Sequence, residues 1–190
     1  ERFVHKLCEQ LQIPLHSTRV RVGDRPGNIE AEGRQARRQF FAELAANHRY
    51  DRVALAHNRD DRIETFFLNL LRGSGSEGLT SMEPVTGNLI RPLIETPRAD
   101  IETYLREKSQ PWCTDSTNAD LRFARNRLRL EVIPGLAARY NTGLADALGR
   151  TVDILHEENL WMRELASSWL DRHGTKTEDS YVIDAEVLSG

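Results

Sequence analysis

The chain has 190 residues, 39% of them hydrophobic and 29% charged, a composition typical of a folded globular protein rather than a disordered or fibrous one. Its length predicts one complete core plus part of a second domain, and its short, charge-interrupted apolar runs exclude a membrane-spanning helix. The formal net charge of −3 hides an asymmetry, because residues 1–150 carry 23 basic and 20 acidic side chains, so any RNA contact needs a local basic surface.

The first elements alternate between helix and strand. A helical apolar pattern opens the chain and stops before Pro14, and residues 15–22 then alternate as a strand does. After a turn at residues 23–27, Asn28 can cap a long helix with an apolar stripe. The stripe consists of Ile29, Ala36, Phe40, Phe41 and Leu44.

A short apolar strand at residues 52–56 leads directly into a helix whose apolar positions run from Ile63 to Leu71 and which closes at Arg72-Gly73. Strands that alternate with long helices predict an α/β fold with a parallel sheet. The later elements are an extended piece at 89–93, helices over 98–108, 121–133 and 143–171, and a strand at 181–183. A boundary near 134–143 divides the chain into an α/β part, 1–135, and the start of a helical domain, 136–190.

Residues 57–61 are the leading candidate site, because ligands of open α/β sheets bind at the carboxyl ends of the strands. Asp60 and Asp61 beside His57 at a helix amino terminus suit magnesium binding or proton transfer. The structural alternative is a capping box in which Asp61 caps the helix and Glu64 reaches back to it. The two roles are compatible.

Three further features each have a functional and a structural interpretation. Arg37 shares the inward face of its helix with Phe40, so its partner is either a phosphate or a structural carboxylate. The glycine-rich loop 73–78 follows a helix, is not a Walker loop, and is either a ligand contact or an ordinary connector. Beyond a cap-rich turn at 114–118, three arginines on one helical face either contact phosphate or RNA or pair with nearby acids. They are Arg122, Arg125 and Arg129.

Cysteine usage and the first residue bear on location and completeness. Cys8 and Cys113 lie far apart in no Cys/His cluster, which argues against a zinc site and against a disulfide-stapled secreted fold. A reducing cytoplasm is the expected location. Glu1 opens within a helical pattern, so a fragment is expected rather than a natural start.

Three groups of residues, in this order, resemble the tRNA(Ile)-lysidine synthetases of the PP-loop superfamily, which are N-type ATP pyrophosphatases. They are residues 28–37, residues 56–75, and a third group from Ile90 through Trp112, 115–118 and 125–129 to Pro134. The resemblance covers roughly residues 1–140 and is looser beyond. It implies an incomplete, Rossmann-like core of the adenine nucleotide alpha hydrolase type, followed by a mainly helical region that begins a tRNA-binding domain.

The resemblance also implies a reaction. ATP adenylates the C2 oxygen of the wobble cytidine (C34) of tRNA(Ile), and L-lysine then displaces AMP to give lysidine. Mg²⁺ is the expected metal, with no ligands assigned, and the expected assembly is a homodimer without a membrane partner.

Residue roles follow from the same resemblance. Arg37 would neutralise the α-phosphate, while His57 and Asp61 would orient substrates and transfer protons. The nucleotide and substrate pockets would be formed by Asp60, Glu64, Arg72, Gly73, Ser74 and Gly75. Phosphate or tRNA would be bound by Arg125, Asn126 and Arg129.

The sequence departs from the family pattern at Arg38, Asn58 and Arg62, where a tyrosine, a second histidine and a glutamine are frequent. It also lacks the Ser-Gly-Gly-x-Asp-Ser phosphate loop, so this chain by itself is expected to be inactive. Two alternatives stay open. One is a thiolating PP-loop enzyme, which normally needs cysteines or an iron–sulfur cluster, and the other is a non-catalytic RNA-binding remnant.

Overall fold

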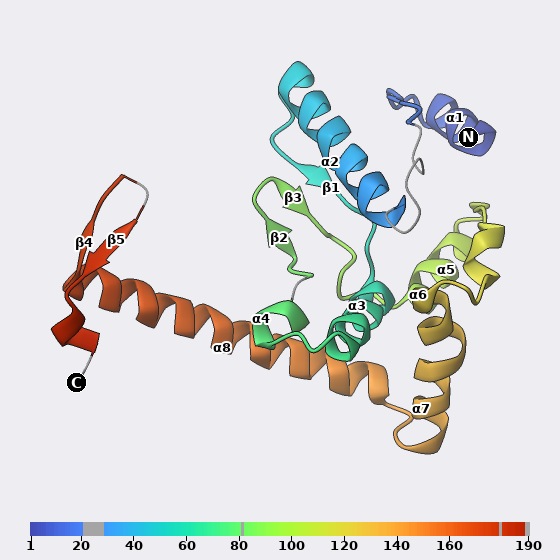
Figure 1. Cartoon of the computed structure of the whole chain (residues 1–190). Coiled ribbons are helices and arrows are strands. Elements are labelled where there is room, and N and C mark those ends of the chain that lie inside the picture. Colours follow the sequence, from blue (N-terminus) through green and yellow to red (C-terminus); the bar gives the residue numbers. More distant parts are fainter. Residues whose placement is uncertain (21–28, 81, 179, 189–190) are drawn as a thin grey trace.

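The computed structural model describes residues 1–20, 29–80, 82–178 and 180–188. Its helices are α1 (Arg2–Leu11), α2 (Ile29–His48), α3 (Arg59–Leu71), α4 (Ser76–Leu79), α5 (Arg98–Glu107), α6 (Ala124–Arg127), α7 (Ile133–Arg139) and α8 (Leu144–His173). Its strands are β1 (Val53–Ala54), β2 (Val85–Thr86), β3 (Leu89–Ile90), β4 (Gly174–Lys176) and β5 (Tyr181–Ile183). Figure 1 shows a body of helices around a small sheet, from which α8 runs out to a separate hairpin of β4 and β5.

The central sheet has the strand order β1-β3-β2. β1 and β3 are parallel, with Val53 opposite Leu89, while β2 is antiparallel to β3. A parallel pair needs a crossover connection, and α3 and α4 lie in it, which confirms the predicted α/β class. Because the two strands are parallel, their carboxyl ends leave the sheet at one edge, where His57 follows β1 and Arg91 follows β3.

The core is built on α3. Ile63 and Phe66 on this helix are buried, as are Leu128 from the segment after α6 and Val152 from α8. Burial of apolar side chains of this size stabilises a fold by about 1.5–3 kcal/mol each. The helix that follows β1 is therefore held from both sides, which positions its amino terminus.

The amino-terminal prediction is partly wrong. Residues 15–20 form no strand, because no strand in the described part of the chain lies beside them to pair with their backbone groups. Residues 21 and 22, the turn at 23–27 and the Asn28 cap lie outside the described residues. The long helix that follows is confirmed as α2.

The predicted helix 121–133 is interrupted. Residues 121–123 precede α6, and a π-turn at Leu128–Val132 separates α6 from α7. Pro134 has no N–H to donate to the carbonyl of Leu130, so a regular α-helical ladder cannot pass through this point. The π-turn carries Arg129, which the next subsection places in the site.

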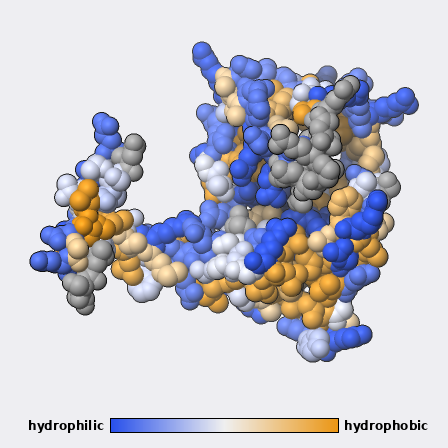
Figure 2. Space-filling model, in the orientation of Figure 1, coloured by the Kyte–Doolittle hydropathy of each residue, from blue (hydrophilic) through white to orange (hydrophobic). Residues whose placement is uncertain are grey.

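The other predicted elements are confirmed as β1, α3, α5, α8 and β5, and the extended piece at 89–93 as the two residues of β3. The domain boundary at 134–143 stays a prediction, and the first half of α8 packs back on α3 and α4 (Figure 1). No helix in the described ranges is long and apolar enough to cross a membrane. Figure 2 shows the far end of α8 and its hairpin standing away from the body, and Trp161, Leu165 and Val182 in these elements are exposed.

Candidate active site

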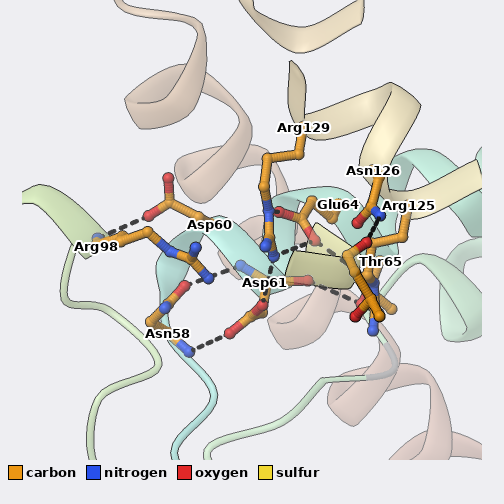
Figure 3. Close-up of polar contacts among 10 residues, drawn as sticks. Asn58, Asp60, Asp61, Glu64, Thr65, Arg98, Arg125, Asn126 and Arg129 are labelled. Carbon is orange, nitrogen blue, oxygen red and sulfur yellow. Dashed lines mark hydrogen bonds and ion pairs between the residues drawn. The ribbon is translucent and has the colours of Figure 1, made fainter. Parts of the chain in front are cut away.

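The amino terminus of α3 is closed by a reciprocal capping box (Figure 3). The backbone N–H of Asp61 donates to Oδ1 of Asn58, and the backbone N–H of Asn58 donates to Oδ2 of Asp61, both at 3.0 Å. Asn58 has the extended backbone of an N-cap, and Asp61 is the third residue of the helix. The predicted cap at Asp61 is therefore wrong by three residues, because Asn58 is an equally good capping residue and lies next to the strand.

Glu64 does not reach back to the helix terminus but faces Arg129. The guanidinium donates from Nε to Oε1 of Glu64 at 2.5 Å and from Nη2 to Oε2 at 2.9 Å, and Nη2 also lies 3.2 Å from Oδ1 of Asp61. Asp61 and Glu64 share one face of α3 because they are three residues apart. One arginine thus bridges both carboxylates (Figure 3).

This bridge lies in the interior. The Glu64 side chain is only 1% exposed. Burial raises the pKa of the Glu64 carboxyl, and the hydrogen bond and positive charge of Arg129 oppose that shift. The ionised form of Glu64 therefore depends on Arg129.

Arg125 and Asn126 border the same carboxylates. Nη2 of Arg125 donates to Oγ1 of Thr65 at 2.9 Å, and its Nε lies 3.5 Å from Oε2 of Glu64. Asn126 is buried, and its amide donates to the carbonyls of Thr117 and Asp120. Asn126 thus anchors the turn before α6, and its contact with tRNA stays a prediction.

The predicted arginine face is only partly correct. Arg125 and Arg129 point toward α3, but Arg122 precedes α6 and pairs with Asp120 at 2.7 Å on the surface. The alternative of pairing with nearby acids holds for all three, because each lies within ion-pair distance of a carboxylate.

Asp60 lies beside the bridge and binds another element. Its Oδ2 accepts the backbone N–H of Arg98, the first residue of α5, at 2.8 Å (Figure 3). This contact places the amino termini of α3 and α5 side by side, so Asp60 has a structural role in addition to any substrate contact.

His57 interacts electrostatically both with Arg37 and with the cluster formed by Asp61, Glu64, Arg125 and Arg129. The His57 ring is half-buried, and its Nδ1 is buried without a hydrogen-bond partner among the described residues. Burial lowers the pKa of His57, the charges of Arg91, Arg125 and Arg37 lower it further, and Asp61 opposes them. Arg37, His57 and Asp61, the residues expected to be catalytic, are thus in one electrostatic neighbourhood.

The structure corrects the predicted orientation of Arg37. Its side chain is exposed rather than inward-facing, and its Nε donates to the carbonyl of Gly33 at 3.3 Å. Phe40 and Leu44 are half-buried, so the inward face of α2 exists without Arg37. Among the side chains that the structure describes, no carboxylate accepts a hydrogen bond from Arg37, and because its side chain is exposed its guanidinium is accessible to an anion.

The state of His57 predicts a pH dependence of stability. Because its folded pKa is lowered, neutral His57 contributes stability that is present above its ordinary pKa of about 6.5 and is lost as the pH falls through the folded value. We expect His57→Gln to flatten the dependence of the unfolding free energy on pH between about pH 7 and pH 5, as measured by urea denaturation. His5→Gln is the matched control, because His5 is exposed. An unchanged slope in His57→Gln would contradict this account.

The loop of Arg72, Gly73, Ser74 and Gly75 is not brought to this cluster. It follows the carboxyl end of α3, whose 13 residues separate it from Asn58 by about 20 Å at the rise of an α-helix. Gly73 has φ +77°, a conformation that favours glycine, so it ends the helix as predicted. Any contact of this loop with substrate is made away from the carboxylates.

The carboxylates present do not make a metal site. No group of three or more His, Cys, Asp or Glu in the described part of the chain could hold a metal ion. Both oxygens of Glu64 and both oxygens of Asp61 already accept hydrogen bonds, and Oδ2 of Asp60 accepts a backbone N–H. These residues do not fit a resident Mg²⁺.

Two residues of this neighbourhood were not predicted. Thr65 joins Arg125, and Arg91 acts on His57 from the end of β3 while its guanidinium donates to the carbonyl of Glu83 and the hydroxyl of Thr86. The position of Arg91 after a strand parallel to β1 was the signal that could have identified it.

Comparisons with known proteins identify the family of this chain. Residues 1–136 match the PP-loop domain family. The tRNA(Ile)-lysidine synthase of Solibacter usitatus is 46% identical over 86% of this chain and 37% of its own length. That of Rhodopirellula baltica is 35% identical over 100% of this chain and 50% of its own length, so the chain spans half or less of these relatives.

A solved structure shares the fold. The U34-tRNA thiolase NcsA from Methanococcus maripaludis with its [4Fe-4S] cluster matches with a TM-score of 0.57 at 14% identity, over 80% of this chain and 55% of that chain. The PP-loop family match and this likeness together confirm the predicted core of the adenine nucleotide alpha hydrolase type. Because the family match covers most of the residues described above, including the whole carboxylate–arginine cluster, the chain belongs to the PP-loop domain family.

Proposed function

We propose that this chain carries part of the active site of an enzyme that attaches lysine to C2 of the wobble cytidine of tRNA(Ile) at the expense of ATP. The observation that carries the proposal is the cluster of His57, Asp61 and Glu64 with Arg129 at the carboxyl end of β1. The similarity to tRNA(Ile)-lysidine synthases supports the choice of substrates.

In the first step, the C2 oxygen attacks the α-phosphorus of ATP and pyrophosphate leaves. The accessible guanidinium of Arg37 would bind the α-phosphate and stabilise the charge that develops on it. Mg²⁺ would enter with the nucleotide, as part of the proposal, because the carboxylates among the described residues do not fit a resident ion.

In the second step, the ε-amine of lysine attacks C2 and AMP leaves with the former C2 oxygen. A lysine ammonium must lose a proton before it can attack, and His57, whose lowered pKa keeps it neutral, is suited to accept that proton. Asp61 is the acidic group beside it, and Asp60 and Glu64 would attract the ammonium. Arg125 would contact phosphate or tRNA once the substrates displace part of its present pairing.

The experiment uses the protein as its source makes it, with transcribed tRNA(Ile). We expect AMP release that requires both lysine and a cytidine at the wobble position, and a nucleoside whose mass equals cytidine plus lysine minus water. A tRNA with uridine at that position is the control and should release no AMP above background. Folded protein that consumes no ATP under these conditions would overturn the proposal.

Two parts of the proposal have their own tests. A homodimer is expected, and sedimentation equilibrium measures it. Thiolation is the second candidate, because the matched solved structure is a tRNA thiolase. Cys113 is exposed and Cys8 is half-buried, and the described residues contain no cysteine cluster. If the enzyme incorporated sulfur in place of lysine, the cysteines or cluster required would have to lie outside the described residues.

A further inference from the structure

Helix α8 lies against α3 and α4 along its first half (Figure 1), and the proposed function gives this contact no role. Beside the buried Val152, its docking face carries polar side chains spaced three, four or seven residues apart, as one face of a helix requires. These side chains are Asp146, Asp153, His156, Asn159 and Arg163.

Two of them reach the first turn of α3. Oδ1 of Asp146 accepts from Arg59 at 2.5 Å, and Oδ1 of Asp153 accepts from Arg62 at 2.7 Å. Arg59 and Arg62 are three residues apart and share a face of α3, whereas Asp61 lies between them in sequence and faces Arg129. The turn that carries Asp61 is thus held by α8 on one side and by the π-turn on the other.

The two ion pairs differ in how deeply the arginine is buried. Asp146 is mostly exposed, and pairs of this kind contribute little. The Arg62 side chain is only 9% exposed, while that of Asp153 is 57% exposed. Within the described ranges, Asp153 is the carboxylate that pairs with Arg62. A buried cation that loses its counter-ion is driven toward water, and any backbone shift of Arg62 in that direction also moves Asp61, its neighbour in the same helical turn.

A further contact shows that α8 holds the whole unit. Asn159 is buried, its Oδ1 accepts from the hydroxyl of Ser76 at 2.8 Å, and its Nδ2 donates to the hydroxyl of Thr80 at 3.0 Å. One side chain of α8 therefore forms hydrogen bonds at the first residue of α4, the short helix after α3, and at the residue that follows its last turn. The placement of α8 is fixed independently of the Arg62 pair.

We infer that Asp153 is a positioning residue for the proposed reaction: by neutralising the buried Arg62 guanidinium, it keeps the α3 turn that presents Asp61 and Glu64 from being displaced. This rests on the proposed function for its kinetic consequence.

The test compares Asp153→Asn, Arg62→Gln and the double variant in the full protein. Asp153→Asn leaves Arg62 buried without a counter-ion, so we expect kcat for lysine-dependent ATP consumption to fall about tenfold, with KM changed by less than about twofold. Amide hydrogen exchange in the first turn of α3 should accelerate about tenfold. Arg62→Gln removes the buried charge itself, and both it and the double variant should stay within about threefold of the unmodified protein.

Glu158→Gln is the matched control, because Glu158 is an exposed carboxylate on the same helix. The inference is overturned if Asp153→Asn behaves like this control, or if the double variant is no better than Asp153→Asn. Hydrogen exchange needs no turnover, so it decides the inference even if the unmodified protein consumes no ATP with lysine. A failure to consume ATP would contradict the proposed function but not the structural inference.

Discussion

Arg129→Met is expected to lower the free energy of unfolding by about 3–5 kcal/mol, because it leaves the buried Glu64 carboxylate without its bidentate partner. Methionine retains the apolar stem of the arginine and fills much of its volume, so the loss reports mainly on charge. Urea unfolding at neutral pH measures it. The double variant Glu64→Gln/Arg129→Met should recover a large part of the loss, since it also removes the unpaired charge.

The stability lost in Arg129→Met is also expected to depend on pH, with a sign that follows from the pKa of Glu64. Burial raises the pKa of Glu64, and without Arg129 the charge of Arg125 is left to oppose that shift without the hydrogen bonds that Arg129 donates. A carboxyl whose folded pKa is raised gives stability that is present below its unfolded pKa and is lost as the pH rises through the folded value. The loss of unfolding free energy in Arg129→Met, relative to the unmodified protein, should therefore become smaller as the pH is lowered toward about 4.3, the ordinary pKa of glutamate.

A surface arginine supplies the control for this experiment. Arg122 also pairs with a carboxylate, but its side chain is 88% exposed, so Arg122→Met should change the unfolding free energy little. Equal losses for Arg122→Met and Arg129→Met would show that the buried bridge has no special part in stability.

Asp61→Asn is expected to reduce kcat for lysine-dependent ATP consumption by about 10²–10⁴-fold, the range that removal of a positioned proton-transfer group usually costs. Stability should change much less, because the amide oxygen can still accept the Asn58 N–H and the Asn58 cap itself is untouched. Steady-state kinetics and urea unfolding of the same preparation measure both effects.

The capping role of this turn can be separated from its chemistry. Asn58→Ala removes the oxygen that accepts the Asp61 N–H and should cost about 0.5–2 kcal/mol of stability, while Asp61 keeps its carboxylate. If Asp61→Asn retained kcat within a factor of about ten of the unmodified protein, Asp61 would act only in the capping box and the proton-transfer role would fall.

Much of the fold could be predicted because its signals are local. Apolar spacing identified α3, and the apolar run before His57 identified β1 and, with it, the sheet edge that carries the site. The fold class followed from the alternation of strands and helices. Periodicity and capping depend on residues within a turn or two, so a single sequence contains them.

Other features were decided by packing between distant segments. The burial of Asn126 and Leu128, and with it the direction in which Arg125 and Arg129 point, depends on how this segment packs against α3. Residues 15–20 alternate as a strand does, yet form none in the absence of a neighbouring strand.

The pairings at the site show the same division most clearly. The sequence by itself supplied the carboxylates at the start of α3 and the arginines after residue 121, in a family-like order. It could not show that Arg129 bridges Glu64 across 65 residues, or that Arg62 pairs with Asp153 across 91. An ion pair forms where tertiary packing buries one charge beside another, and burial is a property of the folded chain that no local pattern records.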